Sequence, residues 1–134
     1  MKEIVIDGVE YTLTPKHIET EEVLYNDWRL PSIQELLTLV DYTKVKPACK
    51  LENTTSDYYW SSTTNASNTD YAWYVNFSGG YTGNHLKSGS NSVRCVRDSE
   101  HGLQWSKTNP INMNWKQALE FAKDLIAPVY KEIL

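Results

Sequence analysis

The side chains that could do chemistry show no catalytic or metal-binding spacing. His17, His85 and His101 are scattered, with no pair four residues apart and no acidic partner at triad spacing. The chain also lacks a Gly-x-Ser-x-Gly motif and a phosphate-binding loop. Ser61 and Ser62 have no base tied to them, so we expect their hydroxyls to satisfy buried backbone groups near a strand end. The sequence therefore predicts no catalytic residue, no metal site and no cofactor, and a protein that is not an enzyme.

Polar and aromatic residues gather instead in the segments 64–70 and 74–92, which are rich in Asn, Ser, Tyr, Gly and Thr. Tyr and Asn offer contact area and adaptable hydrogen bonds at a modest cost in entropy, as they do in antibody loops. We therefore expect a ligand-binding surface here, although an ordinary polar set of strands is the open alternative. The expected contacts are Tyr74, Asn76, Tyr81, Asn84, His85 and Lys87, and the expected rim residues are Asn65, Asn68 and Asp70.

A short helix over residues 33–41 has the clearest local pattern. Ser32 predicts its N-cap, and Glu35 three residues later completes a capping box. Ile33 begins a series of apolar residues at spacings of three and four, which gives the helix one apolar face. Arg29, just before the helix, is expected to tie this corner to backbone carbonyls or to an acid. The aromatic residues expected in the core are Trp28, Trp60, Trp73 and Trp105.

Several segments read as strands. Residues 4–13 predict a hairpin, because Asp7 and Gly8 form the preferred two-residue turn between runs of strand-forming residues. Residues 16–25 predict a solvated connection, and 44–55 a loop. The remaining strands are expected over 57–63, 71–77, 81–87 and 92–97.

The last three of these strands are separated by short Gly- and Ser-rich turns, which predicts three adjacent antiparallel strands, a meander. Residues 71–77 alternate between two faces. Trp73, Val75 and Phe77 are expected on one face, and Ala72, Tyr74 and Asn76 on the other.

The last part of the chain predicts a short strand over 102–105 and a second helix. Asn114 is its expected N-cap, with Gln117 at the capping-box position and Pro128 as its stop. Its apolar face is expected to consist of Trp115, Ala118, Leu119, Ala122, Leu125 and Ile126. The predicted fold class is therefore α+β, with two short helices packed on antiparallel sheets.

Length, net charge and the distribution of apolar residues limit the kinds of partner and the cellular compartments that are expected for the chain. The chain has 134 residues, one domain by size, and a net charge of −4, which argues against nucleic acid as a partner. It has no run of about 18 apolar residues for a membrane span and no signal peptide at its start. As written it is expected in the cytoplasm, with a virion or cell-surface location as the alternative. Cys49 and Cys95 are expected to be half-buried free thiols.

Five motifs in order resemble the signature of the Lcl carboxy-terminal domain family over residues 26–98. They are Trp28-Arg29-Leu30-Pro31, Glu35-Leu36, Tyr59-Trp60-Ser61-Ser62, Ala72-Trp73-Tyr74-Val75-Asn76-Phe77 and Val93-Arg94-Cys95-Val96-Arg97. The resemblance implies a C-type-lectin-like fold related to the formylglycine-generating enzymes. Members are mostly surface or exported bacterial and phage proteins that bind ligands, and the collagen-like adhesin that names the family is associated with sulfated polysaccharides.

The chain departs from that family in the order of its parts. Family domains usually open with a Gly-Leu-x-Trp strand and a Trp-x-x-Ala-Leu helix, which here come last, over 102–105 and 115–119. This order resembles a circular permutation, in which the tail helix would lie beside the helix at 33–41. The rival is a truncated second repeat with a loose tail. Ala122 stands where the family usually has a cysteine, which puts in doubt the disulfide that such a cysteine would form with Cys95.

The expected organisation is thus a single domain over 1–134. It comprises an N-terminal hairpin and connection (1–25), the family core (26–98) and a strand-helix tail that completes the fold (99–134). The expected function is a non-enzymatic module of bacterial or phage origin that recognises a glycan or protein ligand through its strands and polar loops. One alternative is an intracellular phage-type accessory or inhibitor protein that binds one host protein. Another is a cysteine-dependent oxidase, which would require Cys49 and Cys95 to be adjacent and exposed.

Overall fold

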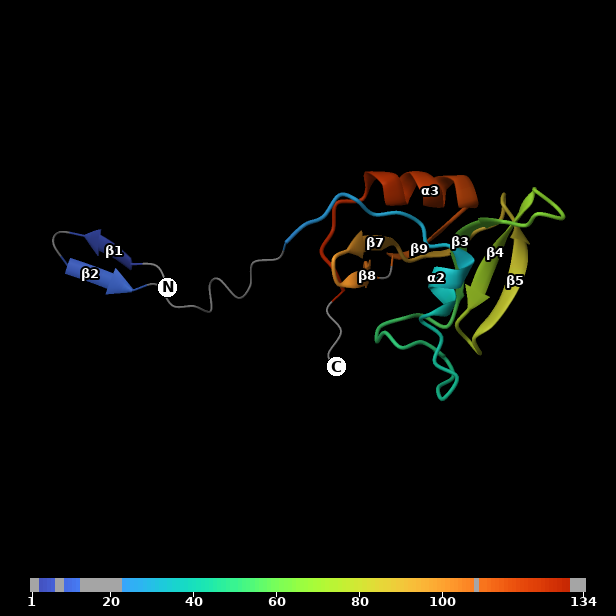
Figure 1. The fold of residues 1–134 in the computed structure, drawn as a ribbon, viewed down its shortest axis with the longest axis horizontal. Helices are drawn as coiled ribbons and strands as arrows, with labels where there is room; N and C mark the ends of the chain where they lie inside the picture. The colour runs from blue at the N-terminus through green and yellow to red at the C-terminus, as the bar shows by residue number, and fades with distance from the viewer. Residues whose placement is uncertain (1–2, 7–8, 13–22, 108, 131–134) are drawn as a thin grey trace.

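The computed structural model describes residues 3–6, 9–12, 23–107 and 109–130 (Figure 1). Within them the chain is α+β, with most of its regular structure in β-sheets and two short helices. β1 (Glu3–Ile6) and β2 (Val9–Thr12) pair antiparallel, with Ile6 opposite Val9, which confirms the two predicted hairpin strands. Asp7, Gly8 and most of the predicted connection lie outside the described residues.

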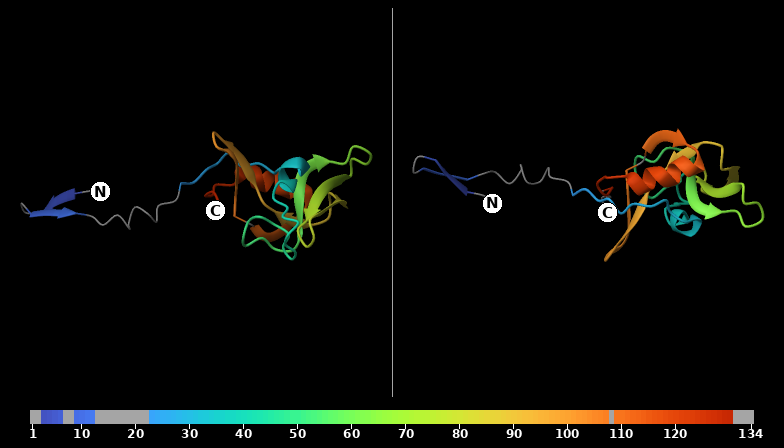
Figure 2. Two further views of the ribbon diagram at one scale, coloured as in Figure 1. Left: turned by 60° about the horizontal axis from the view of Figure 1, so that its bottom comes forward. Right: turned by 90° about the horizontal axis from the view of Figure 1, so that it is seen from above.

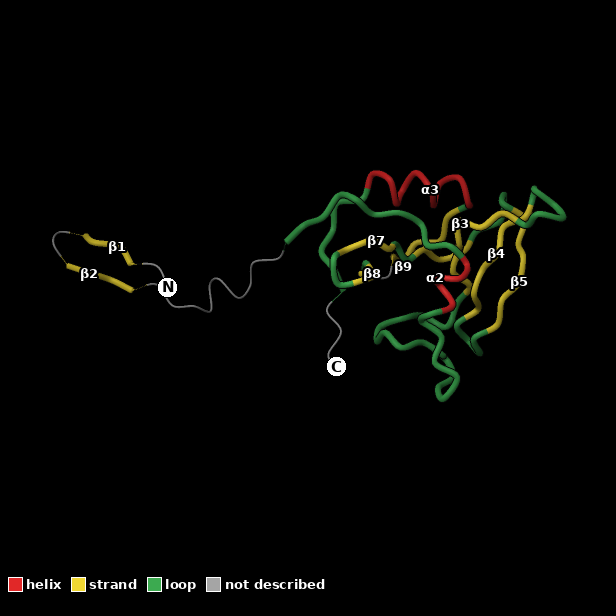
Figure 3. The backbone as a smooth tube through the Cα atoms, in the orientation of Figure 1, coloured by secondary structure: helices red, strands yellow, loops and turns green. Residues whose placement is uncertain are grey.

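A five-stranded sheet forms the centre of the molecule (Figure 3). Its order is β5-β4-β3-β6-β9. The strands are β3 (Tyr58–Thr64), β4 (Tyr71–Asn76), β5 (Tyr81–Leu86), β6 (Asn91–Val93) and β9 (Asn109–Met113). β7 (Val96–Ser99) and β8 (Gly102–Trp105) form a separate antiparallel pair that projects from the sheet (Figure 2).

The predicted meander is wrong in its third strand. β4 and β5 are antiparallel neighbours, but β6 crosses to the other side of β3 and runs parallel to it, with Tyr59 opposite Ser92. All residues from 91 to 96 are buried, and a strand covered on every side belongs inside a sheet rather than beside the exposed edge strand β5. The predicted strand over 92–97 is also divided in two, because β7 leaves the sheet to pair with β8. The edge strand β9 was not predicted.

Neighbouring residues of β3 enter two separate cores. Tyr59 and Trp60 are both fully buried and, as successive strand residues, point to opposite faces. Tyr59 packs with Ile33 and Leu36 of α2 (Ile33–Leu37), and Trp60 packs with the core residues of α3 (Trp115–Asp124). The sheet therefore separates the two helices. The expected position of the tail helix beside the first helix is therefore wrong. α3 lies on the opposite face of the sheet, where it buries Trp60.

Both predicted capping boxes are present. Ser32 and Glu35 cap α2, and Asn114 and Gln117 cap α3, each with both hydrogen bonds formed. α2 ends at Leu37, earlier than predicted, because the next residues form tight turns of the i→i−3 type.

α3 ends at Asp124 rather than at Pro128. Of its predicted apolar face, Ala118 and Ala122 are buried, whereas Ile126 lies beyond the helix and is 66% exposed.

Two indole N–H groups attach the tail to β3. Trp60 Nε1 donates to the backbone oxygen of Met113 at 2.9 Å, and Trp115 Nε1 donates to the backbone oxygen of Ser61 at 2.9 Å. Ala127, further along the tail, pairs through its backbone with Tyr25. The tail is thus hydrogen-bonded to β3 and to the segment that precedes α2, rather than loose.

The predicted role of Arg29 is confirmed, and the group it binds is an acid. Its two terminal nitrogens donate to the Glu35 carboxylate at 2.6 and 2.7 Å, and one of them also donates to Asp98 Oδ1 at 3.1 Å. The Arg29 guanidinium lowers the pKa of Glu35 to about 2, and a hydrogen bond from the Ser32 backbone adds to this effect. A single carboxylate therefore serves the helix cap and the preceding corner together.

The remaining core predictions hold in large part. Trp28, Trp60 and Trp105 are buried, whereas Trp73 is half-buried against the α2 core. Cys49 and Cys95 are free, as predicted, but both are fully buried rather than half-buried. They belong to different cores, on the α2 and α3 faces respectively.

Candidate functional site

The register of β4 and β5 places most of the expected contact residues on one face of the sheet. Asn76 pairs with Tyr81, and Tyr74 pairs with Gly83, so these side chains lie on the face that also carries Trp60. His85 lies on the same face, opposite Ala72. Asn84 pairs with Trp73 and therefore points to the other face. The expected contact residues are thus divided between the two faces, and alternation along β5 could have shown this.

A stacked pair of tyrosines dominates this face. The rings of Tyr58 and Tyr74 lie 4.4 Å apart at an angle of 8°. Burial, with Tyr58 as a second cause, raises the pKa of Tyr74. A Cβ atom on Gly83 would collide with the Tyr74 hydroxyl, so the glycine allows this ring to lie across the neighbouring strand. Tyr58 was not among the expected residues, because only the β3–β4 pairing brings it here.

We call the surface formed by Tyr58, Tyr74, Asn76 and Tyr81 the tyrosine face. Tyr58 is 43% exposed and Tyr81 is 69% exposed, so two of its rings are open to solvent. Asn76 is less free, since its Oδ1 accepts a hydrogen bond from the backbone N–H of Ser78 at 2.9 Å. The tyrosine face is consequently aromatic, partly exposed and held by the strands beneath it.

His85 and Lys87 are fixed at the side of the tyrosine face. The His85 ring stacks on Trp60 with 5.6 Å between centroids, and its Nδ1 lies 3.1 Å from Asn91 Oδ1. The Lys87 ammonium lies 4.1 Å from the centre of the Trp115 ring, a cation–π contact. Both side chains therefore contribute to the packing of α3 on the sheet, in addition to any contact with a ligand.

A small polar pocket adjoins Tyr58. Its volume is about 200 Å³. It is lined by Asp57, Tyr58, Ser90, Asn91, Ser92 and Asn112. Asn91 is only 4% exposed, and its Nδ2 has no hydrogen-bond partner among the described residues. Ser92 Oγ donates to Asn112 Oδ1 at 2.8 Å, which fixes the opposite wall. The sequence did not predict Asn91 as a site residue, because its position depends on the crossover of β6 to the far side of β3.

The three expected rim residues lie in the turn between β3 and β4. Asn65 Oδ1 accepts from the Ser67 backbone N–H at 2.9 Å, and Asn68 Oδ1 accepts from the Asp70 backbone N–H at 3.3 Å. These side chains shape the turn. Asp70 is exposed, and its backbone oxygen accepts from the Lys87 N–H at 2.9 Å. The turn is thereby joined to the end of β5.

The surroundings of Ser61 and Cys95 are structural in the described part of the chain. Ser61 Oγ donates to the backbone oxygen of Trp73 at 2.6 Å, the structural role that the sequence predicted. Burial raises the pKa of the Cys95 thiol to about 12. No group of three or more His, Cys, Asp or Glu side chains in the described part of the chain is placed to hold a metal ion. None of the helices described is long and apolar enough to cross a membrane.

Of three comparisons with known proteins, one gave a match. Searches of curated proteins and of solved structures each gave none. A family model, the Lcl C-terminal domain, matches residues 14–97, from before the first core residue to β7. β8, β9 and α3 lie beyond the matched residues. Since the match covers more than half of the sequence, the chain belongs to the Lcl C-terminal domain family.

Proposed function

We propose that the protein is a non-enzymatic binding module that recognises a glycan or protein ligand through the tyrosine face and the polar pocket beside it. The observation that carries this proposal is the partly exposed Tyr58–Tyr74 stack, which stands next to a pocket with an unpartnered buried amide. A C-type-lectin-like fold, which the family resemblance implies, is part of the same proposal.

The geometry supports binding because the surface is formed before the ligand arrives. Tyrosine provides a large apolar contact with a polar tip, and it has few rotatable bonds to fix on binding. Stacking and the β4–β5 pairing already hold the Tyr74 ring, so little further entropy is lost. The polar pocket adds donors and acceptors that can fix the orientation of the ligand.

The charges favour a neutral or cationic ligand. Asp57 lines the polar pocket, Asp70 is exposed at the rim, and the whole chain carries a net charge of −4. Sulfated polysaccharides and nucleic acids are therefore disfavoured on electrostatic grounds. The alternative of a phage-type accessory protein that binds one host protein would use the same face. The cysteine-dependent oxidase is not supported, since both thiols are buried in different cores.

The test compares the wild-type chain with Tyr58→Ala and Tyr81→Ala variants on glycan arrays and in pull-downs from bacterial lysate. The matched control is Leu103→Ala, because Leu103 is an exposed apolar side chain on β8, in the strand pair that is separate from the five-stranded sheet. A bound glycan or a single stoichiometric protein that is lost with either face variant and kept by the control would support the proposal. Ligand binding that is unchanged in both face variants would refute the tyrosine face as the site.

A further inference from the structure

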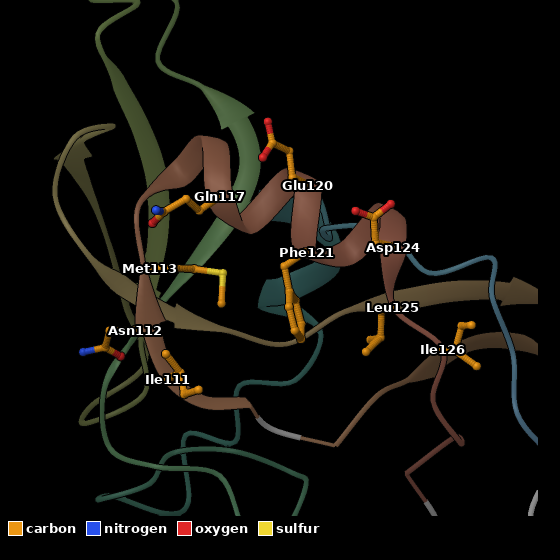
Figure 4. A pocket seen from close by; sticks show the side chains of 9 residues that line it. All are labelled: Ile111, Asn112, Met113, Gln117, Glu120, Phe121, Asp124, Leu125 and Ile126. Atoms are coloured by element: carbon orange, nitrogen blue, oxygen red, sulfur yellow. The ribbon is translucent and has the colours of Figure 1, made fainter.

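A groove between β9 and α3 forms a second concave surface, with a volume of about 640 Å³ (Figure 4). We call it the apolar groove. It is lined by residues 111–113, by one side of α3 and by residues 125 and 126.

The floor of the apolar groove is hydrophobic. Met113 and Phe121 point into the space between the strand and the helix, and Leu125 follows one turn further along (Figure 4). Ile111 and Ile126 are each 66% exposed at its open side. Contiguous exposed apolar surface of this kind marks an interaction site more often than a free surface does. Methionine suits such a site, because its flexible thioether adapts to the shape of a partner.

The outer edge of the apolar groove is acidic. Glu120 and Asp124 stand four residues apart on α3 and project from its outer side (Figure 4). No ion pair joins either carboxylate to another residue in the described part of the chain. The two lysines of α3, Lys116 and Lys123, do not line the groove, and Lys123 lines a different pocket together with Trp28 and Leu119. The groove therefore has acidic but no basic side chains among its lining residues.

We propose that the apolar groove docks a cationic amphipathic helix of a partner protein. The apolar side of such a helix would cover Phe121 and Met113, and its Lys or Arg residues would face Glu120 and Asp124. The groove runs along α3 from Gln117 to Asp124, about 10 Å or two helical turns. It can therefore take two or three apolar side chains at spacings of three and four residues. The apolar groove shares Asn112 with the polar pocket but contains no residue of the tyrosine face, so its proposed occupant does not depend on the proposed function.

Charge decides between this occupant and a second copy of the chain. The chain has a net charge of −4, so two copies repel each other on average. A cationic helix is instead attracted to an edge that already carries two unpaired carboxylates. Docking of that helix would bring positive charges to Glu120 and Asp124 and would also cover the apolar floor.

The experiment uses the full chain and two synthetic 18-residue peptides, one of Leu and Lys and one of Leu and Glu, with the same helical apolar face. We expect the Leu/Lys peptide alone to shift the backbone resonances of α3 and the methyl signals of Ile111 and Ile126. A Glu120→Lys/Asp124→Lys variant should weaken its binding at least tenfold, and a Glu120→Gln/Asp124→Gln variant should weaken it less. The matched control is Glu52→Lys/Glu100→Lys, which reverses two exposed charges elsewhere.

Equal binding of both peptides, or equal loss with the control variant, would overturn the proposal. So would resonance shifts that map outside the apolar groove. The third arm is light scattering of the chain alone, which measures its oligomeric state. A dimer that becomes monomeric in the Phe121→Ser variant would assign the groove to a second copy of the chain. Tyr81→Ala is expected to leave peptide binding unchanged, which keeps this test independent of the tyrosine face.

Discussion

Replacing Glu35 by Gln tests the link between the helix cap and the Arg29 corner. The wild-type carboxylate accepts from Arg29 at 2.6 and 2.7 Å and from the Ser32 backbone N–H at 2.9 Å. Glutamine still suits the capping box but carries no charge. The substitution therefore removes the ionic part of the contact and retains much of the cap.

The magnitude follows from the pKa of Glu35. A carboxyl group whose pKa is about 2 in the folded chain, against 4.5 ordinarily, adds at most about 3.4 kcal/mol to the free energy of unfolding at neutral pH. The side chains of Arg29 and Glu35 are 41% and 24% exposed, so solvent screens the pair. We therefore expect Glu35→Gln to lower the free energy of unfolding by about 1–2 kcal/mol, which is at the upper end of what partly exposed ion pairs contribute.

The assay is urea denaturation of the wild type and of Glu35→Gln at several pH values. At about pH 7 the midpoint should fall by about 1 M for a typical slope. Because the folded pKa lies below the unfolded one, the carboxylate stabilises fully above pH 4.5. Its contribution is lost as the pH falls toward about 2. The difference between the two proteins should vanish over that range.

A difference that is absent at about pH 7, or equal at about pH 7 and about pH 3, would refute the reasoning. Glu52→Gln is the matched control, because Glu52 is exposed in a loop, and it should change stability by less than about 0.5 kcal/mol. Glu35→Ala should cost about 0.5–1 kcal/mol more than Glu35→Gln, since it also removes the cap acceptor.

Four further outcomes are expected. Gly80→Ala should cost about 3 kcal/mol in urea denaturation, because its φ is +84° and a new Cβ would lie 2.7 Å from a valine methyl. Gly102→Ala, with φ of +100° and open space around it, should cost only about 1 kcal/mol. Cys49 and Cys95 should resist alkylation near pH 8 until the chain is unfolded, since both are buried, and rapid labelling of the native chain would contradict this. Deletion of 102–134 should abolish cooperative unfolding, and a truncated chain that keeps its stability would favour the loose-tail alternative.

Local sequence signals predicted local structure well. Both capping boxes depend on residues three positions apart, and both are present with the predicted partners. The strand 102–105 and the β4–β5 pairing were also predicted, because each requires only alternation and a nearby turn. The order of the sheet was not predicted, since the position of β6 depends on burial against β3 and β9, far away in the sequence.

The candidate site follows the same division. Tyr74, Asn76 and Tyr81 could be grouped from alternation and a hairpin turn. Tyr58 and Asn91 could not, because they arrive through the pairing of β3 with β4 and β6. Tyr58 completes the tyrosine stack and Asn91 lines the polar pocket. The parts of the site that depend on pairing between distant strands could therefore not be predicted from the sequence.

The two indole hydrogen bonds between β3 and the tail have a consequence for biosynthesis. Trp60 and Met113 are separated by 53 positions in the chain. At about 5–20 residues per second, translation therefore needs roughly 3–10 s to supply the partner of that indole. During this interval β3, β4 and β5 exist without α3, and Trp60 has neither its cover nor its acceptor. The nascent chain should consequently be most prone to aggregation, and most dependent on chaperones, in the seconds before its last helix emerges from the ribosome.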